Sequence, residues 1–354
     1  MDVAWTRILA RLARAATYIL RFNLPWTLWR LLPSSLRLSC YRRLQRCGHR
    51  EPFSSITQLP FNLVLKEKRE DPRIEVDNTR FVSTHTSIPV PQILDVILLS
   101  TAETEKGGVI LMSKIEGESL WEWVIPRIRH APEAAALIAQ LEACMESNDL
   151  EPIMGIAAEL EKMPRPTVDM SDDDLLVKDL RRAMNELRDL PPPSRAVSGL
   201  AGRPLLIGRA GEKYFAGPFA DQDEFKEALF RKVSNIFRYR LPRLRRLAEP
   251  VFAKTHRICF THADLHHDNI LIKDGRLAAI IDWEHAGWYP EYWELTTMEA
   301  LMVRTYSMNA FWDQVHPFGL GAYRDELKLE WVLSRSTGLM GVVGEDGDDY
   351  ECPR

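Results

Sequence analysis

The sequence predicts an α+β protein with two lobes: a small N-terminal lobe built on an antiparallel sheet with one helix, and a large, mostly helical C-terminal lobe. The chain has 354 residues, 45% of them hydrophobic and 27% charged, so it is long enough to bury two cores. Strand patterns dominate residues 53–117, and helical periodicity dominates residues 118–345. An extension precedes the lobes over residues 1–52, and an acidic tail that we expect to fray follows over residues 346–354.

The first 50 residues carry an unusual charge. They contain ten Arg, no Lys and one acid, Asp2, which gives a net charge of +9; the overall charge of −4 therefore leaves −13 on the other 304 residues. Such a segment is compatible with a mitochondrial presequence, a membrane-surface helix, or a helical extension that packs on the small lobe with its arginines solvated. We favour the packed extension and expect a cytoplasmic protein, with a mitochondrial location as the alternative.

Apolar residues recur at helical spacing within this extension. Pro25 and Pro33 break the pattern, and Ser34 or Ser35 is suited to cap the helix that follows Pro33. No apolar run reaches the roughly 18–20 residues of a membrane span, so we expect no transmembrane segment.

The small lobe is predicted from apolar strands separated by turn signals. Its expected elements are a strand over Asn62–Leu65 that ends at Lys66, a helix over residues 72–85, an extended stretch at Pro89–Pro91, and strands over Ile93–Leu99 and Val109–Ser113. A hinge over residues 113–117 leads into the large lobe.

Proline and acidic residues mark the helices expected in the large lobe. These helices run from Pro132 to about Glu146, from Ser171 and the acids at 172–174 to the prolines at 191–193, and from Asp221, with Glu224 completing a start that resembles a capping box. Between the first two we expect a polar, proline-punctuated excursion on the surface over residues 146–171.

Charge and cysteine content exclude some classes of protein. The pI of about 6.2 does not indicate nucleic-acid binding, because the protein as a whole is not basic. The cysteines are odd in number and lack metal-ligand spacing, so they are typical of free thiols in a reducing compartment. They are Cys40, Cys47, Cys144, Cys259 and Cys352.

The most informative stretch of the chain carries three polar residues at a defined spacing. Asp264 precedes Asn269 by five residues, and Asp282 follows Asn269 by thirteen. Residues 270–281 read as strand, Asp-Gly turn and strand, a hairpin that would return Asp282 toward Asn269. Phosphoryl transfer from ATP needs one carboxylate to orient the acceptor hydroxyl, and an amide and a carboxylate to hold Mg2+. We therefore predict Asp264 as the catalytic carboxylate, and Asn269 and Asp282 as metal ligands.

Histidines in the same stretch permit a second interpretation. His262, Asp264, His266, His267 and Asp268 are potential Zn2+ or Fe ligands, as in metal-dependent hydrolases. The other six histidines are scattered, and the hydrolase hypothesis leaves Asn269 and Asp282 without a role. Under the phosphotransfer hypothesis His262 braces the catalytic loop through hydrogen bonds.

The strings Phe260–Leu265 and Asp282–Glu294 resemble the aminoglycoside phosphotransferase and choline kinase superfamily, and in particular its fungal-type branch. That family's loop reads roughly His-Gly-Asp-Leu-His-x-x-Asn, and its metal Asp lies in Ile-Asp-Trp/Phe-Glu. Thr86–Pro91 and Gly217–Phe219 extend the resemblance, which covers about residues 56–340; Ala263 stands where the family usually has Gly. The resemblance implies a protein-kinase-like fold and a kinase that uses ATP and Mg2+ to phosphorylate an alcohol group.

The resemblance also implies nucleotide-binding residues in the small lobe. Lys66 matches the strand lysine that contacts the phosphates, and Glu75 matches its helical partner. Lys68 and Asp77 are close rivals for these two positions. Met112 and Lys114 fall in the segment whose backbone would meet the adenine.

No glycine precedes Lys66 between Phe53 and Phe61, so backbone contact with the phosphates is in doubt. A degenerate scaffold that binds nucleotide without turnover is the alternative.

The acceptor is expected to be a small molecule with a hydroxyl group, and the sequence indicates no oligomeric state. Aromatic residues near Asp282 could form a cation-π cage for a quaternary ammonium, although packing of the large lobe is the interpretation we favour. These aromatics are Trp283, Trp288, Tyr289, Tyr292 and Trp293. Glu284, Glu291 and Glu294 could attract an amine, and Glu294 could equally be the buried partner of an arginine.

Overall fold

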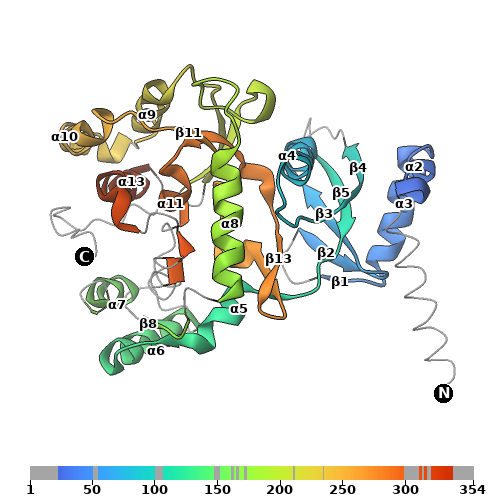
Figure 1. The fold of residues 1–354 in the computed structure, drawn as a ribbon, viewed down its shortest axis with the longest axis horizontal. Coiled ribbons are helices and arrows are strands. Elements are labelled where there is room, and N and C mark those ends of the chain that lie inside the picture. The colour runs from blue at the N-terminus through green and yellow to red at the C-terminus, as the bar shows by residue number, and fades with distance from the viewer. Residues whose placement is uncertain are drawn as a thin grey trace. The chain divides into compact units, whose positions relative to one another are not determined.

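The structure, a computed structural model, describes residues 23–50, 55–99, 107–146, 152–160, 163–164, 167–170, 174–209, 212–233, 235–298, 311–312, 315–316 and 320–337 (Figure 1). The chain divides into two compact units. Unit 1 comprises Met1–Thr84, Pro89–Glu116 and Ala278–Glu284, and unit 2 comprises His85–Ile88, Gly117–Leu277 and His285–Arg354. The frayed tail that we predicted lies outside the described residues, as does the start of the arginine-rich extension.

Unit 1 is built on a five-stranded antiparallel sheet in the order β1-β2-β3-β5-β4. Its strands are β1 (His49–Arg50), β2 (Ile56–Leu59), β3 (Leu63–Lys68), β4 (Ile93–Leu99) and β5 (Gly107–Ser113), and its helices are α2 (Asn23–Trp29), α3 (Ser34–Gln45) and α4 (Pro72–His85). Unit 2 adds many helices to short strand pairs, so the predicted α+β class, with an antiparallel N-terminal sheet and a mostly helical remainder, is confirmed.

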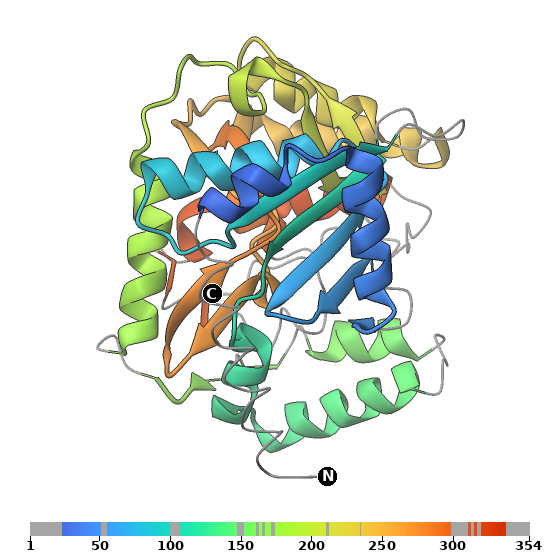
Figure 2. The same cartoon turned by 90° about the vertical axis from the view of Figure 1, so that its right-hand side faces the viewer.

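Helices cover both faces of this sheet because side chains alternate along its strands. Leu63 and Leu65 of β3 pack with Trp26 and Tyr41 of the α2–α3 pair, which crosses that face in Figure 2. On the other face Val76 of α4 packs with Ile110 and Met112 of β5. The even-numbered residues of β3, including Lys66 and Lys68, therefore point to the side of α4.

The helices α2 and α3 show that the described part of the extension packs on the small lobe. Arg37 forms an ion pair with Asp95 of β4, and the Tyr41 hydroxyl donates to the same carboxylate at 2.6 Å. Trp29 Nε1 donates in turn to the Tyr41 oxygen at 2.6 Å. The predicted cap at Ser34 or Ser35 is wrong, because Pro33 occupies the N-cap position without a side-chain hydrogen bond and both serines lie inside the helix.

The length of β3 differs from the prediction, and the turn before it is formed without glycine. The strand does not end at Lys66 but runs to Lys68, whose partner across the ladder is Gly108 of β5. The turn before it contains no glycine, yet Phe61 and Asn62 adopt left-handed φ values of 67° and 56°. Non-glycine residues enter this region at a steric cost, and Asn tolerates it better than most.

Unit 2 consists of helices joined by short strand pairs. Its helices are α5 (Leu120–Val124), α6 (Pro132–Glu146), α7 (Ile153–Leu160), α8 (Leu175–Asp189), α9 (Gln222–Arg231), α10 (Leu241–Phe252), α11 (Trp293–Met298) and α13 (Arg324–Thr337). Its strands are β6 (Glu118–Ser119), β7 (Ile128–Arg129), β8 (Thr167–Val168), β9 (Leu205–Arg209), β10 (Glu212–Ala216), β11 (Ile258–Thr261), β12 (Ile270–Lys273), β14 (Gly287–Pro290) and β13 (Arg276–Ile280), the last of which continues into unit 1.

Local signals placed several of these elements correctly. α6 has the predicted bounds, and Asp221 caps α9 by accepting from the amides of Asp223 and Glu224 at 3.1 and 3.0 Å. Asp274 and Gly275 form the predicted turn between β12 and β13, with φ values of 53° and 69°. The polar excursion is wrong in part, because residues 153–160 form α7, which packs on α6.

Within the described residues no helix is long and apolar enough to cross a membrane. Four cysteines there are free thiols, namely Cys40, Cys47, Cys144 and Cys259.

Candidate active site

Lys66 lies at the centre of a buried charge cluster in unit 1. Its Nζ donates to Glu75 Oε1 of α4 at 2.9 Å and to Asp282 Oδ1 at 2.6 Å. Burial alone would lower the pKa of Lys66, but the two carboxylates outweigh it and the pKa is raised. Lys66 therefore stays protonated although its side chain is only 8% exposed.

Lys68 contacts the same cluster two residues further along β3. Its Nζ lies 3.2 Å from Glu75 Oε2 and forms an ion pair with Glu284. Burial lowers the pKa of Lys68, and the positive charge of Lys66 lowers it further against the effect of Glu75. Glu75 is thus shared by both rival lysines, and Lys66 is the one that also contacts Asp282.

The chain around Asp282 is held against α4 by polar contacts inside unit 1. Asp282 adopts a left-handed φ of 66°, which an Asp tolerates better than most residues. Asn78 Nδ2 donates to the Trp283 carbonyl at 2.9 Å, and Trp283 Nε1 donates to the Ile280 carbonyl at 2.9 Å. Carboxylates of Glu75, Asp282 and Glu284 come within 4.8 Å of one another, so the two lysines compensate a concentrated negative charge.

The segment predicted to meet adenine follows β5. Met112 pairs with Val64 and Ile93 in the sheet. The Lys114 amide donates to the Asn62 carbonyl at 2.8 Å, and its Nζ donates to Gln58 Oε1 at 2.7 Å. The Lys114 amide is therefore already engaged within unit 1, and adenine recognition by this segment stays a prediction.

In unit 2 the loop after β11 brings together three of the predicted site residues. Asn269 Nδ2 donates to the Asp264 carbonyl at 2.8 Å, which leaves the amide oxygen, the atom able to bind Mg2+, on the other side of the planar group. His262 is fully buried, and its Nδ1 accepts from the Asp264 amide at 3.2 Å. His262 therefore braces the loop. Ala263 adopts φ 63°, where the family's usual Gly would fit without strain.

Glu294 of α11 is a loop-supporting residue that sequence reasoning missed. Its carboxylate accepts from the amides of His262 at 2.7 Å and Ala263 at 3.1 Å, so the arginine partner we considered is not its role. Burial raises the pKa of Glu294 to about 7 against the lowering effect of these amides, and the charge of Asp264 raises it further. The sequence does contain one signal of this role. Glu294 is an acid within an apolar, aromatic segment, and a carboxylate buried there needs hydrogen-bond donors.

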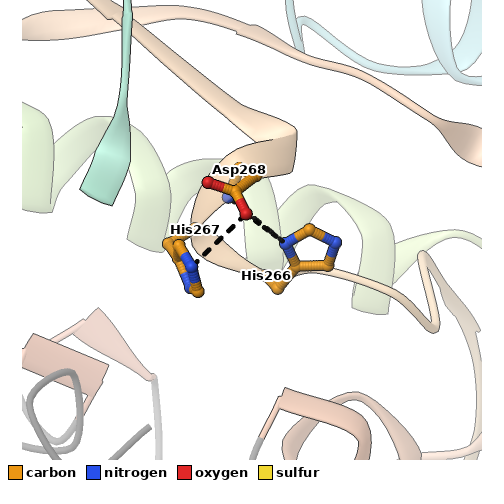
Figure 3. Close-up of side chains that lie close together, drawn as sticks. All are labelled: His266, His267 and Asp268. Carbon is orange, nitrogen blue, oxygen red and sulfur yellow. Dashed lines mark hydrogen bonds and ion pairs between the residues drawn. The ribbon is translucent and has the colours of Figure 1, made fainter. Parts of the chain in front are cut away.

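His266, His267 and Asp268 gather further along the same loop (Figure 3). The distances from Asp268 Oδ2 are 3.4 Å to His267 Nε2 and 3.8 Å to His266 Nδ1. His266 Nδ1 also accepts from the Asp268 amide at 3.2 Å, and the His267 ring packs 5.2 Å from Trp121. These contacts give both histidines a structural role in the loop.

The aromatic residues after Asp282 are buried and pack against one another and against α9. The four that belong to unit 2 are at most 4% exposed, and the Tyr289 and Trp293 rings stack at 5.5 Å. Phe225 of α9 contacts both rings edge-on. The packing interpretation is therefore supported, and a cation-π cage built from these residues is not.

A comparison with protein families identifies the chain. The model of the phosphotransferase enzyme family (APH) matches residues 8–328. The chain belongs to the phosphotransferase enzyme family. The predicted family is thereby confirmed, and the family match gives the competing hydrolase hypothesis no support. No curated protein matches the chain.

Several solved structures of phosphotransferases are similar to this chain. A thermostable mutant of aminoglycoside phosphotransferase APH(4)-Ia without ligand has 15% identity and a TM-score of 0.47 over 81% of this chain and 83% of that chain. APH(3'')-Id from Streptomyces rimosus ATCC10970 has 16% identity and a TM-score of 0.43 over 84% and 97%. The ternary complex of streptomycin, ATP and APH(2")-IIa has 12% identity and a TM-score of 0.44 over 84% and 89%. Structural similarity with such low sequence identity and TM-scores assigns neither a substrate nor site residues to this chain.

Proposed function

We propose that this protein is an ATP- and Mg2+-dependent phosphotransferase that moves the γ-phosphate to a hydroxyl group of a small molecule. The family match supports the reaction class. The contact of Lys66 with both Glu75 and Asp282 is the observation that carries the proposal, because it keeps a buried lysine charged beside a carboxylate suited to a metal.

Each predicted residue receives a role in this proposal. Lys66, positioned by Glu75, would contact the ATP phosphates. Asp282 and the amide oxygen of Asn269 are hard oxygen donors that suit Mg2+, which neutralises phosphate charge when bound. Asp264 would orient the acceptor hydroxyl and take its proton. The segment containing Met112 and Lys114 would meet the adenine through its backbone.

The first experiment is thermal unfolding of the purified chain with ATP, Mg2+, both or neither, since a ligand that binds the folded state raises the midpoint. We expect a rise that needs ATP and Mg2+ together. Asp282→Ala should abolish the rise and Asp264→Ala should retain it, while Asp169→Ala, at an exposed position, serves as the control. A wild-type chain without any nucleotide response would contradict the proposal.

Turnover is then measured as ADP release with a panel of hydroxyl compounds. Asp264→Ala should reduce it by about a hundredfold or more. Nucleotide binding without turnover for any compound would favour the degenerate scaffold, and unimpaired turnover in Asp264→Ala would refute the assignment of that residue. The cytoplasmic location stays a prediction.

A further inference from the structure

The end of α2, the start of α3 and the turn between them carry four leucines that are exposed in the structure. We call Leu28, Leu31, Leu32 and Leu36 the leucine corner; their exposures are 59%, 77%, 37% and 49%. They account for four of the eleven large hydrophobic residues that are exposed in the described part of the chain, within nine consecutive positions. Such a concentration of exposed apolar side chains is typical of an interaction surface.

The backbone of the leucine corner is ordered by hydrogen bonds within the turn and from α3. The Leu31 and Leu32 amides donate to the Leu28 and Trp29 carbonyls at 3.1 Å each. Arg37, itself buried on Asp95, donates through Nε to the Leu32 carbonyl at 3.1 Å. Because the turn is already ordered, a partner gains the apolar contact without the cost of ordering the backbone.

Arginines surround the corner, and acids are absent from the segment. On α3 the exposed residues Leu36, Arg42 and Arg43 fall on one side of the helix, opposite the buried Arg37 and Tyr41, and the C-cap residue Arg46 is also exposed. Arg30 is exposed in the turn itself. Residues 23–50 contain six arginines and neither Asp nor Glu.

We propose that the α2–α3 face docks on the surface of an anionic lipid bilayer, with the leucine corner in the headgroup region and the arginines on the lipid phosphates. Leucine with arginine on one helical face is the pattern of an interfacial helix. The net charge of +9 on the first 50 residues favours the same anionic surface, which repels the −13 on residues 51–354.

Two other occupants fit the chemistry less well. A second copy of this face would bring arginines against arginines without any acid to pair them. Nucleic acid would bind the arginines but would not cover the leucines, because its recognition rests on phosphate contacts and base edges.

The test is co-sedimentation of the full chain with phosphatidylcholine vesicles that contain or lack phosphatidylserine. We expect binding only with phosphatidylserine and weaker binding at high salt. Leu31→Ser with Leu32→Ser should lower the partition coefficient about tenfold or more, because it removes two apolar side chains from the buried area. The matched control is Leu98→Ser with Leu175→Ser, which are 49% and 55% exposed elsewhere and should leave binding unchanged.

The electrostatic part is tested by Arg42→Gln with Arg43→Gln. Each arginine should contribute about fivefold, from roughly 1 kcal/mol per basic residue near an anionic membrane. Arg231→Gln with Arg246→Gln, also exposed, is the control. Leu31, Leu32, Arg42 and Arg43 are all exposed, so the two test variants should keep the thermal midpoint of the wild type.

Three results would overturn the proposal: no binding of the full chain to phosphatidylserine vesicles at low salt, binding that survives the Leu31 and Leu32 substitutions, or equal losses in the leucine control pair. None of these measurements requires ATP. They are therefore independent of the proposed phosphotransfer.

Discussion

The buried carboxylate of Glu294 leads to a quantitative prediction about pH. Burial raises the pKa of Glu294 from 4.5 to about 7. Between these values the folded protein keeps a proton that the unfolded chain releases, so the free energy of unfolding falls as the pH rises through this window. A pKa difference of about 2.5 corresponds to about 3 kcal/mol in the free energy of unfolding. This stabilisation is lost once the pH has passed the folded-state pKa.

Glu294→Gln removes this titration but keeps the shape of the side chain. The unfolding free energy of the variant minus that of the wild type should therefore increase by about 3 kcal/mol between pH 4.5 and about pH 8. Urea unfolding followed by tryptophan fluorescence at several pH values measures this difference. Parallel stability curves for the two proteins across this range would refute the raised pKa and the burial argument behind it.

Glu326→Gln is a matched control with the opposite sign. Glu326 is fully buried, and burial would raise its pKa, but His256 and Lys254, whose nitrogens lie 3.1 and 3.0 Å from Oε1, hold its pKa below the ordinary value. The ionised form is therefore the stabilising one, and its contribution is present at neutral pH and lost as the pH falls. The unfolding free energy of Glu326→Gln minus that of the wild type should therefore become more negative as the pH rises.

Activity should respond to Glu294→Gln in the same range. A carboxylate offers two acceptors to the His262 and Ala263 amides, whereas Gln offers one oxygen and turns an N–H group toward the other amide. Above pH 7 the variant should hold Asp264 less firmly and turn over more slowly than the wild type. The deficit should shrink toward pH 6, where the wild-type carboxyl is itself protonated; a deficit independent of pH would point to a purely structural loss.

Four further substitutions test other parts of the structure. Asp95→Asn should destabilise unit 1 by about 3 kcal/mol in urea unfolding, because it leaves Arg37 buried without its counter-charge; a loss below about 1 kcal/mol would show that the pair is not needed. Phe225→Ala removes a fully buried ring from unit 2 and should cost about 3–5 kcal/mol by the same measurement, whereas a near-neutral effect would contradict the packing seen around it. Lys68→Met should lower stability yet keep the Mg-ATP response in thermal unfolding, and Lys66→Met should abolish that response; the reverse outcome would exchange the roles of the two lysines.

Elements specified by short-range signals could be predicted with their bounds. The helix over residues 72–85, the strand over Ile93–Leu99 and the helix from Pro132 to Glu146 all carry their own periodicity and end signals. The hairpin after Asn269 follows from the Asp-Gly pair at its turn. These features need no knowledge of what the rest of the chain does.

Features set by distant partners could not be predicted. The extension of β3 to Lys68 depends on its pairing with Gly108, and the helix over residues 153–160 is stabilised by its packing on α6. The role of Glu294 depends on amides more than 30 residues away. The sequence marks such residues only as acids or apolar side chains in unusual surroundings, and it does not identify the group that each one meets.

The two lysines of β3 show how far the sequence can narrow a site and where the structure decides. Residues two apart on a strand share a face, so Lys66 and Lys68 both had to point toward the helix that carries Glu75, and periodicity could not separate them. The structure separates them through their second partners. Lys66 lies against Asp282, and its pKa is raised, whereas Lys68 pairs with Glu284, and its pKa is lowered. A residue that must meet phosphate needs a secure positive charge, so this electrostatic difference favours Lys66 as the nucleotide contact and leaves Lys68 to hold the chain that follows Asp282 in place.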